Sequence, residues 1–310
     1  MALQFLRAGL RALAERRRRQ TGPKDTRVEN TRAENTGPEH SGPEADGPEY
    51  AGPAPRLYVF GSSSSEVFDY IFGASRRYRS YWAGGWSARG LRKDANRGYV
   101  LNCLRRARPQ DIIFLHYGVV DAAFSSGYRM DRGDFLDPES FCREAADGVR
   151  MLVQDLRAAG FSNIYTVAVG APCRVPERYF RKRFKLLGLP PRYQAQLLNR
   201  INQLISGFCD RRDLTPVLGD EHGVLKREYH RAKPNHHADY VRIQELVWEG
   251  IRDIPGLPPR RADWRTALYK SGVRGGVGKK IRAENYRAAN LKRFEPAAAL
   301  PREKALAEDA

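Results

Sequence analysis

Two alternating patterns of apolar positions run through residues 56–256. Continuous apolar runs, typical of strands buried on both faces, predict strands at 56–65, 111–118, 163–172 and, more weakly, 214–219. Apolar positions at helical spacing predict helices at 98–109, 138–160, 191–212 and 238–254. Strands that alternate with long helices indicate an α/β domain whose parallel sheet is covered on both faces. Ligands bind at the carboxyl ends of the strands in such sheets.

The segments outside this domain differ from it in composition. Residues 1–20 are basic and amphipathic, with six arginines against one glutamate. They lack the continuous apolar core of a secretory signal, which leaves an organellar presequence, an interfacial helix on anionic lipid or a frayed extension. Residues 21–55 repeat Gly-Pro with acidic residues and almost no aliphatic side chains, so we expect a disordered linker.

Residues 257–310 form a basic C-terminal tail with isolated aromatic residues. Basic residues interleaved with aromatics can follow a nucleic-acid backbone. The tail has no nucleic-acid motif and no fixed spacing, so a solvated tail, or a strap lying over the domain, is the preferred interpretation. We therefore expect no nucleic-acid partner.

The whole chain has a formal net charge of +18 and four cysteines that stand far apart. A positive net charge attracts acidic partners but does not identify them. No two cysteines have metal-site spacing, so we expect neither a metal site nor a disulfide framework. No run approaches the roughly 20 apolar residues of a membrane-spanning helix. These features predict a cytoplasmic protein, at most peripheral to an anionic membrane, or an organellar one if the source is eukaryotic.

The candidate chemistry lies at the ends of the predicted strands. The first strand ends in "GSSSS", and His236 and His237 form a pair before the last helix. A serine hydroxyl becomes a nucleophile when a neighbouring base takes its proton, and histidine is the usual base near neutral pH. The structural alternative is that the serine run caps the helix after it, because Ser63 and Glu66 have the spacing of a capping box. His116, inside an apolar strand, is interpreted as a buried structural histidine.

Four blocks in this order resemble those of the SGNH (GDSL) hydrolases, which are esterases and lipases. Gly61-Ser62-Ser63 is similar to the Gly-Asp-Ser block after the first strand, and "GGWSARGL" to the Gly-Ala-Ser-Ala-x-Gly-Leu form of one bacterial branch, with Gly85 at the backbone donor. "GVVD", from Gly118 to Asp121, is similar to Gly-x-x-Asn or Gly-x-x-Asp, and "KPNHH" to Asp-Pro-x-His-His. The resemblance covers about residues 57–252.

The resemblance implies a three-layer α/β/α sandwich with a flavodoxin-like parallel sheet, and a carboxylic-ester hydrolase that works through an acyl-enzyme without a cofactor. Ser63 is then the nucleophile and His236 the general base, with His237 as a neighbour able to replace it. The N–H groups of Ser63 and Gly85 form the oxyanion hole, flanked by the block from Gly118 to Asp121.

The chain departs from that pattern at three positions. Ser62 replaces an aspartate, and Lys233 replaces the acid that orients the histidine. A backbone carbonyl or a carboxylate from elsewhere, such as Asp239 or Asp220, would have to substitute. Asp121 stands where the family has an amide. A carboxylate cannot donate unless it is protonated, so Asp121 holds a substrate hydroxyl or caps a helix.

The expected substrate is an acylated carbohydrate or a similar small ester. This expectation follows from the branch's likeness to surface-polysaccharide proteins and from an aromatic cluster near the second block, which either packs in the core or holds a sugar ring: Tyr78, Tyr81, Trp82 and Trp86. Two alternatives stay open. One is a catalytically impaired SGNH-fold protein that binds glycans or acts as a scaffold, and the other is a binder of anionic surfaces through the basic tails.

Overall fold

The computed structural model describes residues 53–135 and 137–261, and the architecture below is that of these residues. The predicted basic segment 1–20, all but the end of the linker 21–55, and the tail from residue 262 lie outside the described residues.

The described residues contain five strands that form one parallel sheet in the order β2-β1-β3-β4-β5. The strands are β1 (Leu57–Gly61), β2 (Tyr78–Trp82), β3 (Ile112–His116), β4 (Ile164–Ala168) and β5 (Asp210–Asp213). Every residue of β1 and β3 is buried, as the continuous apolar runs predicted. The strand order is that of flavodoxin-like doubly wound sheets. The prediction of an α/β fold with a parallel sheet is confirmed.

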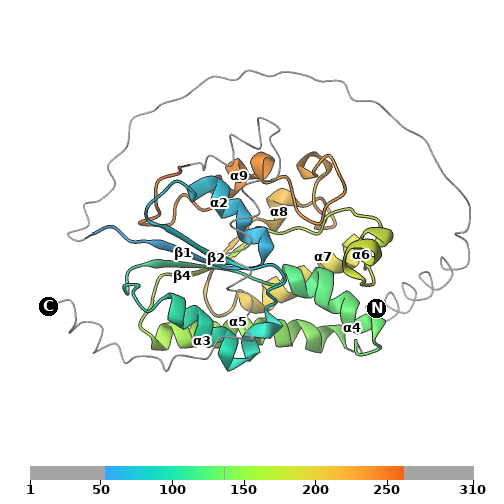
Figure 1. Cartoon of the computed structure of the whole chain (residues 1–310), viewed down its shortest axis with the longest axis horizontal. Helices are drawn as coiled ribbons and strands as arrows, with labels where there is room; N and C mark the ends of the chain where they lie inside the picture. The colour runs from blue at the N-terminus through green and yellow to red at the C-terminus, as the bar shows by residue number, and fades with distance from the viewer. Residues whose placement is uncertain (1–52, 136, 262–310) are drawn as a thin grey trace, which may run out of the picture. The chain divides into compact units, whose positions relative to one another are not determined.

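Helices cover both faces of the sheet (Figure 1). One face carries α3 (Asp94–Cys103), α5 (Pro138–Ala158) and α7 (Pro191–Ile205), and the other carries α2 (Val67–Phe72), α8 (Thr215–Leu218) and α9 (Tyr240–Glu249). Shorter elements lie in the connections: η1 (Ser63–Glu66), η2 (Arg89–Arg92), η3 (Asp121–Ser125), α4 (Ser126–Asp131), α6 (Glu177–Phe184) and η4 (Arg227–Tyr229).

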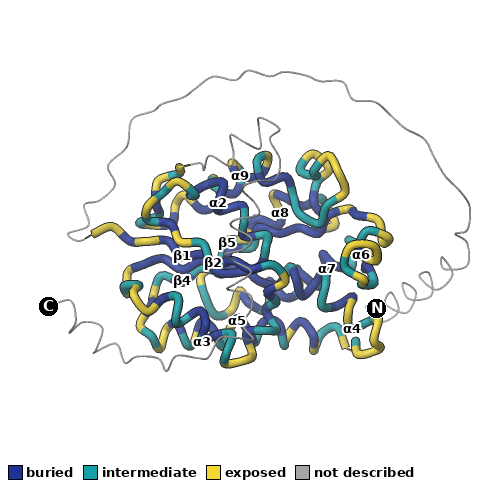
Figure 2. The backbone as a smooth tube through the Cα atoms, viewed as in Figure 1, coloured by how far each residue is buried: buried dark blue, intermediate teal, exposed yellow. Residues whose placement is uncertain are grey.

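The core consists of two apolar layers, one on each side of the sheet (Figure 2). Successive strand residues point to opposite faces, so Tyr58 and Phe60 pack toward α5 and α7, whereas Leu57 and Val59 pack toward α2 and α9. This arrangement fixes the direction of β1 and the place where its carboxyl end leaves the sheet.

The longest helix shows how local sequence sets its boundary. Asp137 accepts hydrogen bonds from the N–H groups of Glu139 and Ser140, and Pro138 occupies the first turn, where its missing N–H costs nothing. The apolar residues of α5 lie on one face and pack on the sheet. The predicted helix at 138–160 is therefore confirmed.

Two predicted elements are wrong in detail. Residues 214–219 do not form a strand: Thr215–Leu218 is the helix α8, because Leu214 and Leu218 are four residues apart and both bury on one side. The helix predicted at 191–212 ends at Ile205, and the fifth strand follows at Asp210–Asp213.

The pattern also missed two elements. The edge strand β2 is only partly buried and its run "YRSYW" includes an exposed arginine, so it lacks the continuous apolar character used to find the other strands. The helix α6 has "ERYFRKRF" with one fully buried residue, Phe180. Both elements are partly exposed, and α6 is rich in charged residues.

Candidate active site

β1 delivers Ser63 to the carboxyl edge of the sheet. The ladder continues past the end of the strand, since the N–H of Ser62 donates to the carbonyl of His116 at 3.1 Å and the N–H of Ala83 donates to the carbonyl of Gly61 at 2.9 Å. The chain then turns at once into η1, whose first residue is Ser63. Ser63 is thus held by two neighbouring strands at the edge where ligands bind in such sheets.

The four serines differ in how far they are buried. Ser62 and Ser65 are fully buried, and their hydroxyls have no hydrogen-bond partner among the described residues. Ser63 and Ser64 are half-buried. The helix starts at Ser62 and Glu66 show no side-chain cap hydrogen bond, and the pairing of Ser63 with Glu66 stays a prediction. Of the two accessible hydroxyls, that of Ser63 is the one nearer the end of the strand.

The backbone N–H groups of Ser63 and Gly85 show no hydrogen bond to a backbone carbonyl among the described residues. Gly61 pairs with Trp82 in the β1–β2 register. Neighbouring strands lie about 4.8 Å apart, so the turn that contains Gly85 leaves the sheet next to Ser63. Gly85 has a φ of +79° and is exposed. Unbonded N–H groups at a helix start favour developing negative charge.

The loop before α9 brings the histidine pair to the same edge. α9 packs against α2, and the ring of Tyr240 lies 5.7 Å from that of Tyr70. The Tyr240 hydroxyl donates to the backbone carbonyl of Ser63 at 3.2 Å and lies 2.8 Å from Nδ1 of His237. One tyrosine hydroxyl therefore joins the segment of the predicted nucleophile to a histidine.

The two contacts of that hydroxyl are compatible with one tautomer of His237, in which Nδ1 carries the proton. A tyrosine hydroxyl has one proton, and the carbonyl of Ser63 can only accept. With its proton on that carbonyl, the Tyr240 oxygen accepts from Nδ1–H of His237. Burial raises the pKa of Tyr240 well above its ordinary value, so the hydroxyl stays neutral. Nε2 of His237 then carries the lone pair, as in a general base.

His236 lies in a different environment. Its ring contacts Phe124, Tyr179 and Phe184, with centroid distances between 5.1 and 6.0 Å. Nδ1 of His236 lies 2.8 Å from the Tyr179 hydroxyl. Burial, together with the charges of Arg183 and Arg231, lowers the pKa of His236 to about 4. This histidine is neutral at pH 7.

The carboxylates proposed to orient a histidine have other hydrogen bonds. Asp239 caps α9 through the N–H of Val241 and faces Arg242. Asp220 accepts from the N–H groups of His222 and Val224 and pairs with Arg174. Lys233 is exposed. In the described part of the chain, tyrosine hydroxyls hold the Nδ1 atoms of both histidines where the family pattern has an acid.

Asp121 acts as a cap for η2. Its buried carboxylate accepts from the N–H of Ala88 at 2.6 Å and from the N–H of Arg89 at 3.2 Å. The side chain thus supports the turn after β2, in agreement with the capping alternative. Burial raises the pKa of Asp121 to about 6, although the two N–H groups and the Arg89 charge act in the opposite direction.

Asp121 should therefore make stability fall as the pH rises. Its folded pKa lies above the ordinary value of 3.8, so the folded state binds more protons between these two values and loses stability across that window. We compare the free energy of unfolding of Asp121→Asn with that of the parent at each pH. The difference should shift in favour of the variant by about 2 kcal/mol between pH 4.5 and pH 7.5. Urea denaturation of both proteins at the two pH values measures this difference. The exposed Asp134→Asn serves as the control, and an equal effect of Asp121→Asn at both pH values would contradict the prediction.

Gly118 and His116, the remaining residues considered in the sequence, are both buried in the fold. Gly118 is buried at the end of β3, where an added Cβ would lie 3.3 Å from both Leu198 and Ile201 of α7. His116 is buried, as interpreted from the sequence, with Nδ1 2.8 Å from the carbonyl of Val167, and burial lowers its pKa to about 4. Its Nε2 atom has no partner among the described residues.

The aromatic cluster near the second block packs inside the fold. Tyr78 and Trp82 are buried and donate to the carboxylate of Asp69, and Trp86 packs edge-on against Tyr99 and Tyr117. Tyr81 is half-buried and lines a cavity elsewhere. For Tyr78, Trp82 and Trp86 the packing alternative holds, because these three rings are buried in the core.

Sequence reasoning missed the aromatic residues that do surround the histidines. Phe124, Tyr179 and Phe184 are half-buried beside His236. Tyr240 could have been found, since it stands three residues after His237 at the start of a predicted helix. Tyr179 and Phe184 gave no signal, because the helix α6 was itself not predicted.

Within the described residues, no three His, Cys, Asp or Glu side chains gather as a metal site. No helix in residues 53–135 or 137–261 is long and apolar enough to cross a membrane.

The fold defines an α/β protein with a flavodoxin-like parallel sheet and a serine at the end of its first strand. No family model and no curated protein matches the sequence. Solved structures to which the chain is similar include esterases and a lipase. A GDSL-like lipase of Bacteroides thetaiotaomicron has 13% identity and a TM-score of 0.44, over 64% of this chain and 87% of that one.

Two further structures show the same degree of similarity. An aryl esterase of M. smegmatis has 14% identity and a TM-score of 0.42, over 65% of this chain and 100% of that one. A carbohydrate acetylesterase of Sinorhizobium meliloti has 12% identity and a TM-score of 0.41, over 64% of this chain and 98% of that one. Such values describe a distant likeness and carry no information about the reaction of this chain.

Proposed function

We propose that this protein hydrolyses carboxylic esters with Ser63 as the nucleophile and His237 as the general base. The observation that carries the proposal is the Tyr240 hydroxyl, which bonds both the carbonyl of Ser63 and Nδ1 of His237. A general base works when the nitrogen that faces the nucleophile has a lone pair and its other nitrogen is held by a hydrogen bond. Tyr240 performs the second task here.

The reaction proceeds in two steps, acylation and deacylation, and in each of them His237 accepts one proton and gives it back, first to the leaving alcohol and then to the Ser63 oxygen. The Ser63 hydroxyl attacks the ester carbonyl while Nε2 of His237 accepts its proton, and the N–H groups of Ser63 and Gly85 stabilise the oxyanion that forms. The alcohol leaves with the proton from His237, and an acyl-Ser63 ester remains. Water, deprotonated by the same nitrogen, then cleaves this ester and restores the serine.

The substrate side of the proposal rests on the rings around His236. Phe124, Tyr179 and Phe184 are partly exposed and form an aromatic wall beside the histidine pair. Such a surface suits an apolar acyl chain or the face of a sugar ring. An acylated carbohydrate, the substrate implied by the sequence resemblance, fits this wall better than the buried cluster near β2.

A fluorophosphonate probe on the full chain tests the nucleophile. We expect stoichiometric labelling of the peptide that contains Ser63, identified by mass spectrometry, and none in Ser63→Ala. Ser64→Ala, the matched change at the neighbouring half-buried serine, should be labelled like the parent. If the parent is neither labelled nor able to hydrolyse nitrophenyl acetate above Ser63→Ala, the protein is a non-catalytic module, and glycan binding becomes the function to test.

A further inference from the structure

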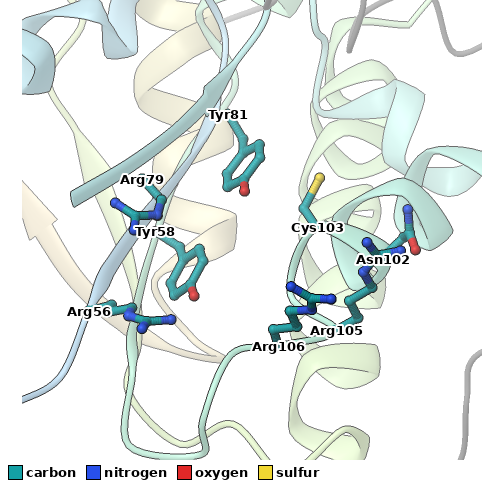
Figure 3. Close-up of a pocket in the computed structure, with 8 residues that line it drawn as sticks. All are labelled: Arg56, Tyr58, Arg79, Tyr81, Asn102, Cys103, Arg105 and Arg106. Carbon is teal, nitrogen blue, oxygen red and sulfur yellow. The ribbon is translucent and has the colours of Figure 1, made fainter. Parts of the chain in front are cut away.

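A cavity of about 440 Å³ lies away from the serine (Figure 3). Its walls include Tyr58 of β1 and Tyr81 of β2, with Arg56 and Arg79 beside them. The opposite wall comes from the end of α3 and the loop after it, with Arg105 and Arg106. A strand advances about 3.3 Å per residue, so Arg56 lies roughly 16 Å along β1 from Gly61. The cavity therefore extends from the amino end of β1, at Arg56, to Tyr81, the fourth residue of β2.

The four arginines of this cavity have no ion pair among the described residues. Elsewhere in the domain many arginines are paired, for example Arg200 with Glu139. All four side chains are exposed, so water screens their mutual repulsion, but four like charges around one cavity attract an anion. Arg105 and Arg106 also follow the C-terminus of α3, where positive charge is favourable. Arg79, in β2, donates one guanidinium nitrogen to the carbonyls of Arg76 and Tyr78, and Arg56 directly precedes β1.

The other groups in the cavity are neutral donors. The rings of Tyr58 and Tyr81 are almost parallel, with centroids 6.3 Å apart and an angle of 7° between them. Burial raises the pKa of Tyr81, and it raises the pKa of the Cys103 thiol to about 11. At pH 7 neither group carries a negative charge, so no lining side chain offsets the four guanidinium groups.

We propose that this cavity binds a small phosphorylated ligand. The phosphate or diphosphate oxygens accept hydrogen bonds from the guanidinium groups, whose forked donors match phosphate geometry. The remainder of the ligand lies against Tyr58 and Tyr81. The volume is within the range of small-molecule pockets, roughly 300–1,000 Å³. The charges surround one cavity instead of following a stripe along the surface, which favours a small ligand over a nucleic-acid strand.

Calorimetric titration of the full chain with inorganic pyrophosphate and with ADP, at constant ionic strength, tests the site. We expect saturable binding of at least one of the two, weakened about tenfold or more in Arg105→Gln/Arg106→Gln. The matched control is Arg157→Gln/Arg192→Gln, which changes the same charge at two exposed arginines outside the cavity. A difference between the two ligands then separates recognition of the phosphate alone from recognition of an attached ring.

Several results would overturn the proposal. They are equal binding of sulfate, equal weakening in both double variants, or binding of an anionic oligonucleotide or vesicle without binding of pyrophosphate or ADP. Glu44, Asp46 and Glu49 stand shortly before Arg56 in the sequence, and negative charges of the chain itself would compete with the added anion. The titration is therefore repeated on a chain in which these three residues are replaced by amides. Absence of binding in both chains also overturns it. Labelling at Ser63 should be unchanged in Arg105→Gln/Arg106→Gln, which keeps this site separate from the proposed hydrolase activity.

Discussion

Replacing His237 by alanine is expected to lower kcat/KM for nitrophenyl acetate by about 10³-fold, since general base catalysis typically contributes 10²–10⁴-fold. Ser63→Ala should lose at least as much. The double variant Ser63→Ala/His237→Ala should be no slower than either single one, because a nucleophile and its base act as a unit. Steady-state kinetics of the three variants, with far-UV circular dichroism to confirm folding, measure this.

Two further variants separate the roles around that base. Tyr240→Phe keeps the ring but removes the hydroxyl that bonds Nδ1 of His237, so kcat should fall about tenfold or more while KM changes little. His236→Ala should cost less than His237→Ala, because Nδ1 of His236 bonds Tyr179 instead. If His236→Ala abolishes turnover and His237→Ala does not, His236 is the base and the assignment from Tyr240 is wrong.

The sequence was informative about the fold where burial imposes a pattern. β1 and β3 are buried at each position, so their apolar runs were visible, and α5 begins with a proline and a capping aspartate that are readable in the chain. The edge strand β2 and the helix α6 meet solvent over much of their surface. Their exposed positions carry polar or charged residues, so the pattern of apolar positions did not reveal these two elements.

The candidate site was predictable only as a set of segments. The position of Ser63 after β1 and of the histidines before α9 followed from the order of elements. The partners of these residues depend on long-range packing: Tyr240 reaches Ser63 across 177 positions, and Tyr179 reaches His236 across 57. The missing acid at Lys233 was visible in the sequence, whereas the contact of Tyr179 with His236 was not.

Gly61→Ala should destabilise the fold by about 3 kcal/mol or more, beyond the usual cost of overpacking. A Cβ at Gly61 would lie 2.2 Å from the carbonyl oxygen of His116 and 2.6 Å from the hydroxyl of Ser65. The carbonyl cannot withdraw, because it accepts the N–H of Ser62 and belongs to the β1–β3 ladder. Only a glycine lets β1 pass this close to β3 and still turn into η1 at Ser63.

Urea denaturation measures this effect against Gly207→Ala, where the added methyl would have no atom within 4 Å and the residue is exposed. The control should change stability by less than about 1 kcal/mol. A Gly61→Ala protein with the stability of the parent would show that the strands can separate at this point. If Gly61→Ala folds but is destabilised, its fluorophosphonate labelling should also fall, because the shift of β1 moves Ser63 away from the Tyr240 hydroxyl that links it to His237.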